Sequence, residues 1–440
     1  MVLTEGLTLD GVDLTDADLY VSRGYPWKDW DLLRREAPVY WYDRPGVEPF
    51  WAITKYEDVL TISKDSKTFV NSQRLRLAPT RKPEEEELYR QMEAGAYLRD
   101  PEALTFNDMD PPEQGKYRNL TNRAFAPRAL RVMESHVEEL AKNFVADFAD
   151  TMVDDIAEQG SCDFVVELAA KLPLAAICEM FGIPRERHND IFIWSERMMG
   201  AADPEYQDTD TDGGMTGLSA ADSMFGYIRE LIEQRRAEGV TGDDLVSALL
   251  RAEVDGEKLT EQRILSYIMI LLIAGNETTR NATTGGLMAL LQNPDQRDLL
   301  VAKPELVPSA VEEILRWTSP VVQFARTCVQ DIEIGGQQIK AGQAVGLFYP
   351  SANRDEAIFE DPYRFDITRD PNDHLAFGGY GAHFCLGANL ARWELRAIFR
   401  TLLRLLPDME LAGDPARLRN VHVGGIKHLP VTYTAQPRGG

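Results

Sequence analysis

A long apolar segment that turns polar at its middle constrains the fold of this chain more than any other feature. Thr260 is a suitable N-cap and Asn293-Pro294 a suitable stop, which predicts a helix of about 33 residues and roughly 50 Å at 1.5 Å per residue. Its first half, ILSYIMILLIAG, is apolar on all sides, as is typical of a helix buried inside a protein. The polar sequence NETTRNATT follows directly. We therefore expect a central buried helix whose polar middle serves a site.

The remaining sequence pattern predicts a mainly α fold with a minor β part. Apolar residues at helical spacing predict further helices over 128–150, 164–181, 219–238 and 388–406. PVYWY and FWAIT around the turn DRPG predict a hairpin within 38–59, and DIEIGG, QQIKAG and AVGLFY predict short strands. Residues 201–217 resemble a loop, and the charged segment 83–100 a short exposed helix in a longer loop. We find no repeat and no linker, so we expect a single domain over 1–440.

Charge and cysteine content limit the compartment and the partners. The formal net charge of -24 argues against non-specific nucleic-acid binding, which needs clustered Lys and Arg. Four scattered cysteines without a CxxC pair fit a reducing compartment better than a disulfide framework. The N-terminus lacks the features of a secretory signal, and no apolar run reaches the roughly 18 residues that span a bilayer. We expect a cytoplasmic protein without a membrane anchor or a nucleic-acid partner.

A glycine-rich loop with one cysteine, FGGYGAHFCLG, lies immediately before the predicted helix that starts near Ala388. Glycines permit unusual backbone angles and the close approach of a flat partner. Backbone N–H groups and a helix N-terminus near Cys385 would lower the pKa of its thiol and tune a thiolate bound to iron. A tight turn around a buried thiol is the alternative interpretation of this loop alone.

Two helical patterns add polar chemistry. AGNETT, residues 274–279, occupies the polar switch of the long helix. Gly275 there costs about 1 kcal/mol relative to Ala, and Glu277 beside Thr278 forms an acid–alcohol pair that could relay protons. Glu313 and Arg316, in EILR, share one helix face. Such a pair is usually an exposed salt bridge worth under about 1 kcal/mol.

With AGNET, then EILR, then FGGYGAHFCLG in this order, the sequence resembles the cytochrome P-450 family along nearly its whole length. FWAITKYEDV, RNLTNRAFAPRAL and FEDPYRFDITR are further segments similar to that family. The resemblance implies the cytochrome P-450 fold, in which a long central helix and the Cys loop pack around haem b (iron protoporphyrin IX). It also implies a monooxygenase that uses O2 and two electrons.

The resemblance assigns a role to each matched residue. Cys385 would bind the haem iron as thiolate, Thr278 would position oxygen and water, and Glu277 would supply protons. Ala274 and Gly275 match small residues that leave room for oxygen. Further contacts with the haem are implied for Gln114, Arg118, Arg326, Phe377, Gly381, His383 and Gly387. A structural role in holding the core near the Cys loop is implied for Glu313, Arg316 and Arg369.

The sequence departs from the family pattern at two positions. Gln114 stands where the family often has His, four residues before the arginine that matches Arg118. A Gln side chain can donate a neutral hydrogen bond but carries no charge, which leaves its contact with a haem propionate open. The family's Phe is usually seven residues before the cysteine, where this chain has Gly378. One extra residue in the loop explains why Phe377 lies one position earlier.

The segments SANRDEAIFEDP, FGGYGAHFCLGANLAR and GGIKHLP are similar to a bacterial group that hydroxylates terminal methyl carbons of steroid side chains and methyl-branched lipids. A large apolar substrate is therefore expected. Positions expected to line its pocket, which could equally be plain core, are Met198, Met199, Leu271, Val322, Phe324 and Val423.

Several other functions remain open from the sequence. A fatty-acid or terpenoid hydroxylase would share every motif, as would a peroxide-driven peroxygenase or a haem-binding protein without turnover. A hydrolase with a cysteine nucleophile is more distant. The acid–alcohol pair favours the route that uses O2, since a carrier or sensor has no need of a proton relay.

Electrons must come from outside, because the chain has no flavin or iron–sulfur motif. We expect NAD(P)H to supply them through a ferredoxin reductase and a small ferredoxin that docks on the Cys385 side of a monomer. Positive charge is concentrated in segments expected on that side, which would attract an acidic partner unless the cluster arises by chance. The residues are Lys116, Arg118, Arg123, Arg128, Arg392 and Arg396.

Overall fold

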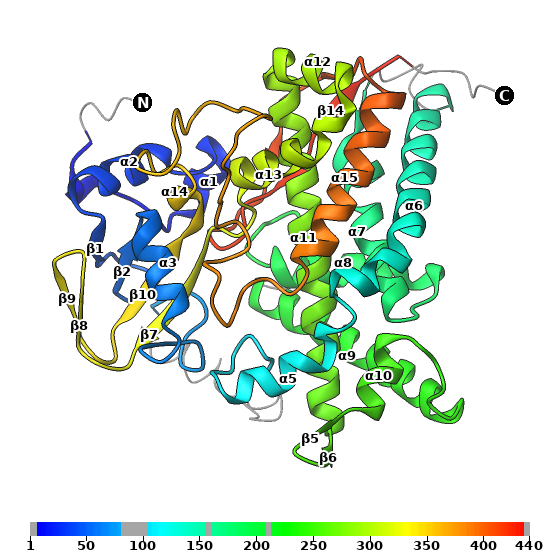
Figure 1. The fold of residues 1–440 in the computed structure, drawn as a ribbon, viewed down its shortest axis with the longest axis horizontal. Helices are drawn as coiled ribbons and strands as arrows, with labels where there is room; N and C mark the ends of the chain where they lie inside the picture. Colours follow the sequence, from blue (N-terminus) through cyan, green and yellow to red (C-terminus); the bar gives the residue numbers. More distant parts are fainter. Residues whose placement is uncertain (1–6, 81–103, 155–160, 208–212, 435–440) are drawn as a thin grey trace.

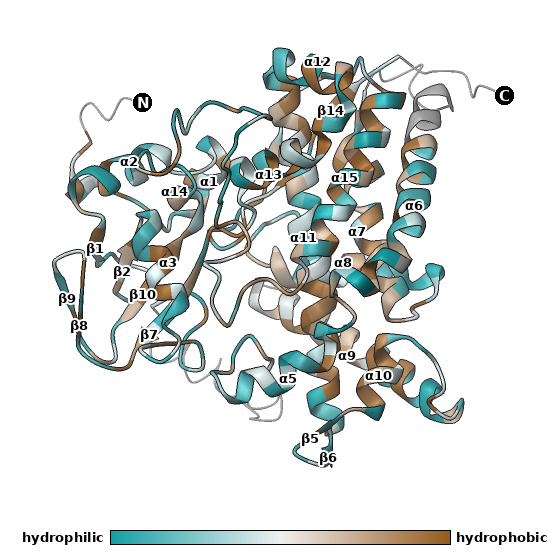
Figure 2. Cartoon of the chain, viewed as in Figure 1, coloured by the Kyte–Doolittle hydropathy of each residue, from teal (hydrophilic) through white to brown (hydrophobic). Residues whose placement is uncertain are grey.

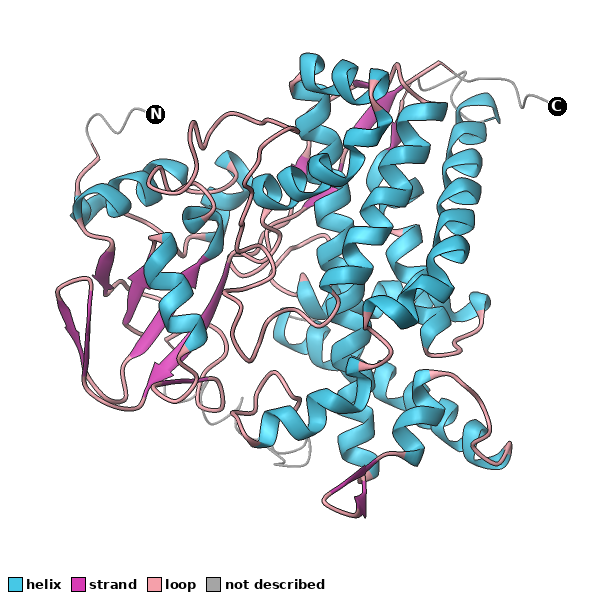
Figure 3. Ribbon diagram, viewed as in Figure 1, coloured by secondary structure: helices cyan, strands magenta, loops and turns pink. Residues whose placement is uncertain are grey.

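The computed structural model of the chain describes residues 7–80, 104–154, 161–207 and 213–434. The predicted short helix within 83–100 lies outside these ranges. Helices fill one side of the molecule and a small sheet lies on the other (Figures 1 and 3). Among the described residues, no helix is both long and apolar enough to cross a membrane.

The helical part contains most of the chain between residues 113 and 318, and α15 is added to it from the C-terminal third. The helices are α1 Ala17–Arg23, α2 Trp27–Glu36, α3 Tyr56–Lys64, α5 Glu113–Asn122, α6 Pro127–Asp154, α7 Lys171–Met180, α8 His188–Met199, α9 Gly213–Ala237, α10 Leu245–Arg251, α11 Glu261–Gln292, α12 Pro294–Ala302, α13 Val307–Thr318, α14 Tyr349–Ala352 and α15 Ala388–Leu405.

Helix α11 is the predicted central helix. Thr260 caps it by accepting a hydrogen bond from the backbone N–H of Arg263 at 3.3 Å, and it continues for 32 residues. Figure 2 shows its N-terminal part as largely apolar and its middle as paler. It packs against α7, α8, α9, α13 and α15. The approach to α13 and α15 requires Gly286, where a Cβ atom would lie 2.6 Å from Ile314 and 2.8 Å from Phe399.

A five-stranded sheet forms the β part, in the order β1-β2-β10-β7-β3. Only β2 and β10 pair in parallel, and every residue of β10 is buried, as expected of a central strand covered on both faces. The strands of this sheet are β1 Val39–Tyr42, β2 Phe50–Ile53, β3 Phe69–Val70, β7 Gln323–Cys328 and β10 Ala344–Phe348. The smaller sheets contain β4 Cys162–Asp163, β5 Glu253–Val254, β6 Glu257–Lys258, β8 Ile332–Ile334, β9 Gln337–Ile339, β11 Glu410–Leu411, β12 Ala416–Arg417, β13 Ile426–His428 and β14 Pro430–Thr432.

These elements confirm the predicted hairpin, the three short strands and most helices. The prediction of one helix over 164–181 is wrong in part, because a π-helical turn, Val165–Ala169, precedes α7. The predicted loop 201–217 is also too long, since α9 starts at Gly213. Thr216, Ala220 and Met224 form a buried face at four-residue spacing; the polar Thr216 hid this pattern in the sequence.

Candidate functional site

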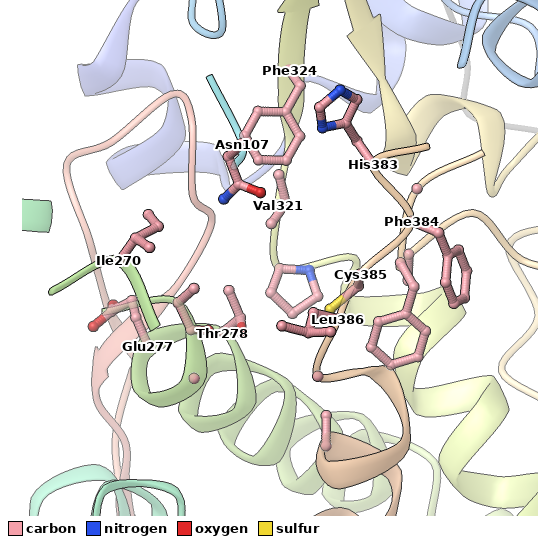
Figure 4. A pocket seen from close by; sticks show the side chains of 18 of the residues that line it. Asn107, Ile270, Glu277, Thr278, Val321, Phe324, His383, Phe384, Cys385 and Leu386 are labelled. Carbon is pink, nitrogen blue, oxygen red and sulfur yellow. Dashed lines mark hydrogen bonds between the residues drawn. The ribbon is translucent and has the colours of Figure 1, made fainter. Parts of the chain in front are cut away.

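A cavity of about 230 Å³ lies between α11, the Cys loop (residues 377–387), β7 and the turn 421–423. Thr278 and Glu277 come from α11 on one side, Cys385 and Leu386 from the Cys loop, and Phe324 from β7 (Figure 4). The elements that build the cavity are thus far apart in the sequence and meet around one space.

Cys385 faces this cavity. Protein surrounds the residue, yet its thiol is accessible because it lines an internal space rather than the outer surface. Burial raises the pKa of the Cys385 thiol, while a hydrogen bond from the backbone of Gly387 and the charges of Arg118 and Arg392 act in the opposite direction. These groups favour a thiolate, and a bound metal cation would favour it further.

The Cys loop is fixed by backbone contacts that require its glycines. The N–H of Cys385 donates to the carbonyl of Phe377 at 3.0 Å. A Cβ atom at Gly381 would lie 1.8 Å from the carbonyl oxygen of Ser63 in α3, so only glycine fits. The side-chain amide of Gln114 donates to the carbonyl of Ala382 at 2.9 Å. The loop is therefore held from both α3 and α5.

One edge of the cavity is formed by two arginines and a histidine, a set of side chains that suits an anion. Arg118, Arg326 and His383 line it, and both ring nitrogens of His383 are buried without a hydrogen-bond partner among the described residues. Burial and the positive charges of Arg326 and Arg118 lower the pKa of His383 to about 3. An anionic group between these three side chains would relieve that repulsion and accept their hydrogen bonds.

The polar middle of α11 forms the opposite wall. The Thr278 hydroxyl donates to the carbonyl of Ala274 at 3.0 Å, which leaves its lone pairs available to the cavity. Gly275 also lines the cavity, but a Cβ atom there would come within 3.2 Å of Ile177 in α7. Its small size therefore serves helix packing as well as the open space.

Glu277 is buried and paired, rather than hydrogen-bonded to Thr278. Its Oε1 lies 2.5 Å from Arg280 Nη2, and Arg280 also reaches Glu196 of α8 at 2.7 Å. Its Oε2 is buried without a hydrogen bond to any described residue. The direct acid–alcohol pair expected from the sequence is therefore absent from the described structure; Arg280 holds the acid and links it to α8.

The Glu313–Arg316 pair is fully buried, so it is not the exposed salt bridge that such a pattern alone usually indicates. Both side chains have 0% exposure, and two N–O contacts of 2.7 and 2.8 Å join them. Arg316 also donates to the carbonyls of Asn353 and Pro362, both at 2.9 Å. Arg369 Nε lies 3.3 Å from Glu313. The cluster joins α13 to the irregular chain that leads to the Cys loop.

These features fit a haem group. A porphyrin needs an axial ligand, a flat apolar space and partners for two propionates. Cys385, the apolar cavity and the edge formed by Arg118, Arg326 and His383 supply donors of these kinds. Gly387 faces open space, since a Cβ atom there would meet nothing within 4 Å, so the loop leaves room beside the thiol. The class of site is that of a haem-thiolate protein.

Comparison with known proteins agrees with this class. A sequence model of the cytochrome P-450 family matches residues 48–407. The chain belongs to the cytochrome P-450 family and is a monooxygenase of that family, whose cofactor is haem iron.

The similar proteins include two enzymes that are named for the oxidation of apolar substrates. A steroid C26-monooxygenase of Rhodococcus jostii is 39% identical over 98% of this chain and 86% of its own. A methyl-branched lipid omega-hydroxylase of Mycobacterium bovis is 42% identical over 91% of this chain and 90% of its own. A Mycobacterium marinum cytochrome P-450 solved in complex with pseudoionone has a TM-score of 0.84 and 34% identity, covering 97% of this chain and all of its own.

Most residues that the sequence assigned to the site lie on the cavity. They are Ala274, Glu277, Thr278, Arg118, Arg326, Phe377, Gly381, His383, Cys385 and Gly387 for the cofactor and the reaction, and Met199, Leu271, Phe324 and Val423 for the substrate.

Three assigned residues lie elsewhere among the described residues. Met198 is about 100° around α8 from Met199 and is partly buried against a core cluster. Val322 is buried in another core cluster, and its neighbour Val321 faces the cavity, since successive side chains of an extended segment point opposite ways. Gln114 holds the loop at Ala382 and does not line the cavity.

Several residues that line the cavity carry no signal in the sequence, because they lie in loops or on helix faces without a motif. They include Asn71, Arg76, Phe106, Asn107, Ile177, Ile270, Ile273, Glu394 and His422.

The cations expected to dock a ferredoxin are partly neutralised. Arg392 binds Glu312 with contacts of 2.8 to 3.0 Å, and Lys116 is paired with Glu113 at 2.9 Å and Asp255 at 2.5 Å. Arg118 turns toward the cavity. The net positive charge available for docking is thus smaller than the sequence suggested. Arg396 lies 3.7 Å from Glu312, a longer contact than that of Arg392. The other cations of the set are Arg123 and Arg128.

Proposed function

We propose that this monooxygenase hydroxylates a terminal methyl group of an apolar substrate, of the steroid side-chain or methyl-branched lipid kind. One observation carries the proposal: Thr278 and Cys385 line the same, mainly apolar cavity from opposite elements (Figure 4). The overall reaction would convert RH, O2, two electrons and two protons into ROH and water.

Haem, held by Cys385 and by the edge formed by Arg118, Arg326 and His383, would supply oxygen activation, which thiolate ligation favours. The chain's own residues would control protons and access. Thr278 Oγ1 would hold a water molecule in the cavity, since its hydrogen is committed to the Ala274 carbonyl and its lone pairs are not. The apolar walls would exclude bulk water from the reaction.

Glu277, once it leaves Arg280, would accept a proton from water and pass it toward Thr278. Arg280 keeps a partner during this exchange, because Glu196 already binds it at 2.7 Å. Burial alone would lower the pKa of Arg280, but the negative charges of Glu277 and Glu196 raise it overall, so the guanidinium stays charged throughout. A movement of α8 would therefore alter how firmly Glu277 is held.

The choice of substrate class draws support from two directions. The cavity wall is apolar apart from a few groups, with Leu271, Phe324 and Val423 in it. The two similar hydroxylases are named for a steroid and for a methyl-branched lipid. We further propose that NAD(P)H supplies the electrons through a ferredoxin and its reductase, and that residues 1–440 act as one cytoplasmic, monomeric domain.

Optical titration of the purified ferric protein tests the proposal. The panel is a sterol enone, a methyl-branched fatty acid and a monoterpene. A ligand that displaces water from the iron shifts the haem to high spin. A shift with the steroid or the branched lipid, followed by a hydroxylated product with reductase and ferredoxin present, is the expected result. A shift with the monoterpene alone would leave the family assignment and reject this substrate class.

A further inference from the structure

Arg76 is a further cation of the cavity, outside the set of residues that the sequence assigned to the haem. It lies in the segment 71–80, and the adjacent Leu75 accepts a hydrogen bond from the backbone N–H of Ala325 in β7 at 2.9 Å. Arg76 lines the cavity and is enclosed by protein, yet its side chain is accessible from within that space. It makes no hydrogen bond or ion pair to any residue that the structure describes.

Arg76 shares the cavity with His422 and Phe324, and its charge acts on the His422 ring. The pKa of His422 is lowered well below its usual range by burial and then by the Arg76 charge. Burial also lowers the pKa of Arg76, and only Asp108 opposes this.

His422 adds a second polar group at the same end of the cavity. It lines the cavity, and its ring packs edge-on against Phe324 at 5.1 Å between centroids. Its Nδ1 is buried without a partner in the described chain. Arg76 and a neutral His422 together offer one positive charge and a further polar ring atom beside an apolar wall.

Asp108 does not satisfy Arg76. Its Oδ2 accepts hydrogen bonds from the backbone N–H and the hydroxyl of Thr105, at 3.1 and 2.6 Å, and it does not line the cavity. Its negative charge is nevertheless close enough to act on Arg76. Asp108 would repel a dianion such as a phosphate ester about twice as strongly as a monoanion at the same distance, and a monoanion matches the single positive charge of Arg76.

We propose that Arg76 is a specificity-determining residue that binds the carboxylate of the substrate, so that the enzyme acts on apolar acids rather than on neutral lipids. A planar carboxylate matches the two parallel N–H donors of a guanidinium. The carboxylate would stand beside Phe324 and His422, and the apolar body would extend toward Thr278 and Cys385. The acid end is thereby fixed and the far, methyl-bearing end reaches the reacting position. This inference rests on the proposed function.

The test compares a methyl-branched fatty acid with its own methyl ester by optical titration of three holoenzymes: wild type, Arg76→Leu and Arg74→Leu. Arg74 is the matched control, because it lies two residues away and pairs with Glu48 at the surface. Loss of a charge-assisted hydrogen bond predicts about ten- to a hundred-fold weaker binding of the acid to Arg76→Leu. Ester binding, and all binding to Arg74→Leu, should be unchanged; Arg76→Lys should restore part of the affinity for the acid.

Haem content and the rate of haem loss are measured on the same proteins. Unchanged haem retention in Arg76→Leu with selective loss of acid binding supports the proposal. Equal acid affinity in wild type and Arg76→Leu overturns it, and faster haem loss with equal acid affinity assigns Arg76 to a propionate instead. A spin shift in wild type with a neutral sterol enone but not with acids overturns this inference and keeps the proposed function. No shift with any of these ligands overturns both.

Discussion

Replacing Arg316 by methionine tests how strongly the buried pair with Glu313 stabilises the chain around the Cys loop. Both side chains have 0% exposure, so the substitution leaves a buried carboxylate with its main counter-charge removed. Breaking a buried ion pair in this way costs about 3–5 kcal/mol. The carbonyls of Asn353 and Pro362 lose their donor as well, at about 1–3 kcal/mol each.

The expected loss is therefore at least about 5 kcal/mol, against a total stability of about 5–15 kcal/mol for typical proteins. Urea denaturation and haem retention would measure it. The double variant Glu313→Gln/Arg316→Met should recover part of the loss, because no unpaired charge remains buried.

Arg400→Met is the matched control. Arg400 pairs with Glu138 at 3.0 Å, but the two side chains are 49% and 50% exposed. Such a pair contributes no more than about 1 kcal/mol. If Arg316→Met unfolds at the same urea concentration as Arg400→Met and retains haem equally well, the buried cluster does not stabilise the loop as argued.

Three further perturbations have defined outcomes. Burial raises the pKa of Glu394 to about 8, above its ordinary value of 4.5, so the neutral carboxyl is favoured in the folded state. The stability that this neutral carboxyl contributes is complete at low pH and is lost as the pH rises from about 4.5 to 8. The unfolding temperature of Glu394→Gln should therefore fall less than that of the wild type between about pH 4.5 and 8, and an equal fall would refute this. Gly381→Ala, which meets the Ser63 carbonyl at 1.8 Å, should lower haem content, whereas Gly115→Ala, with nothing within 4 Å, should not. Thr278→Ala should consume electrons with several-fold less product. Thr283→Ala should stay coupled, because the Thr283 hydroxyl donates to the Thr279 carbonyl within the buried helix. Equal coupling in both would count against Thr278.

The parts of the fold with strong local signals were predictable. The capped apolar helix, the hairpin, the Cys loop and the helix after it carry their patterns in consecutive residues, and the structure confirms these elements. The boundary of α9 was missed because its buried face starts with a polar residue, Thr216.

The site was predictable only where a motif marked it. Glu277 and Thr278 are adjacent in the sequence, but their side chains point in directions about 100° apart on a helix. Arg280 and the distant Glu196 bind the acid instead. Arg76 could not be found from the sequence, since its setting is created by β7 and the turn around His422.

The spectrum of the reduced protein with carbon monoxide tests the assignment of Cys385 most directly. Haem bound through a thiolate gives a Soret band at unusually long wavelength, and we predict this band for the wild type. Cys385→His should lose it while keeping haem, since an imidazole is also an iron ligand. A wild-type band at the shorter wavelength of nitrogen-ligated haem, or an unchanged long-wavelength band in Cys385→His, would contradict thiolate ligation by this residue.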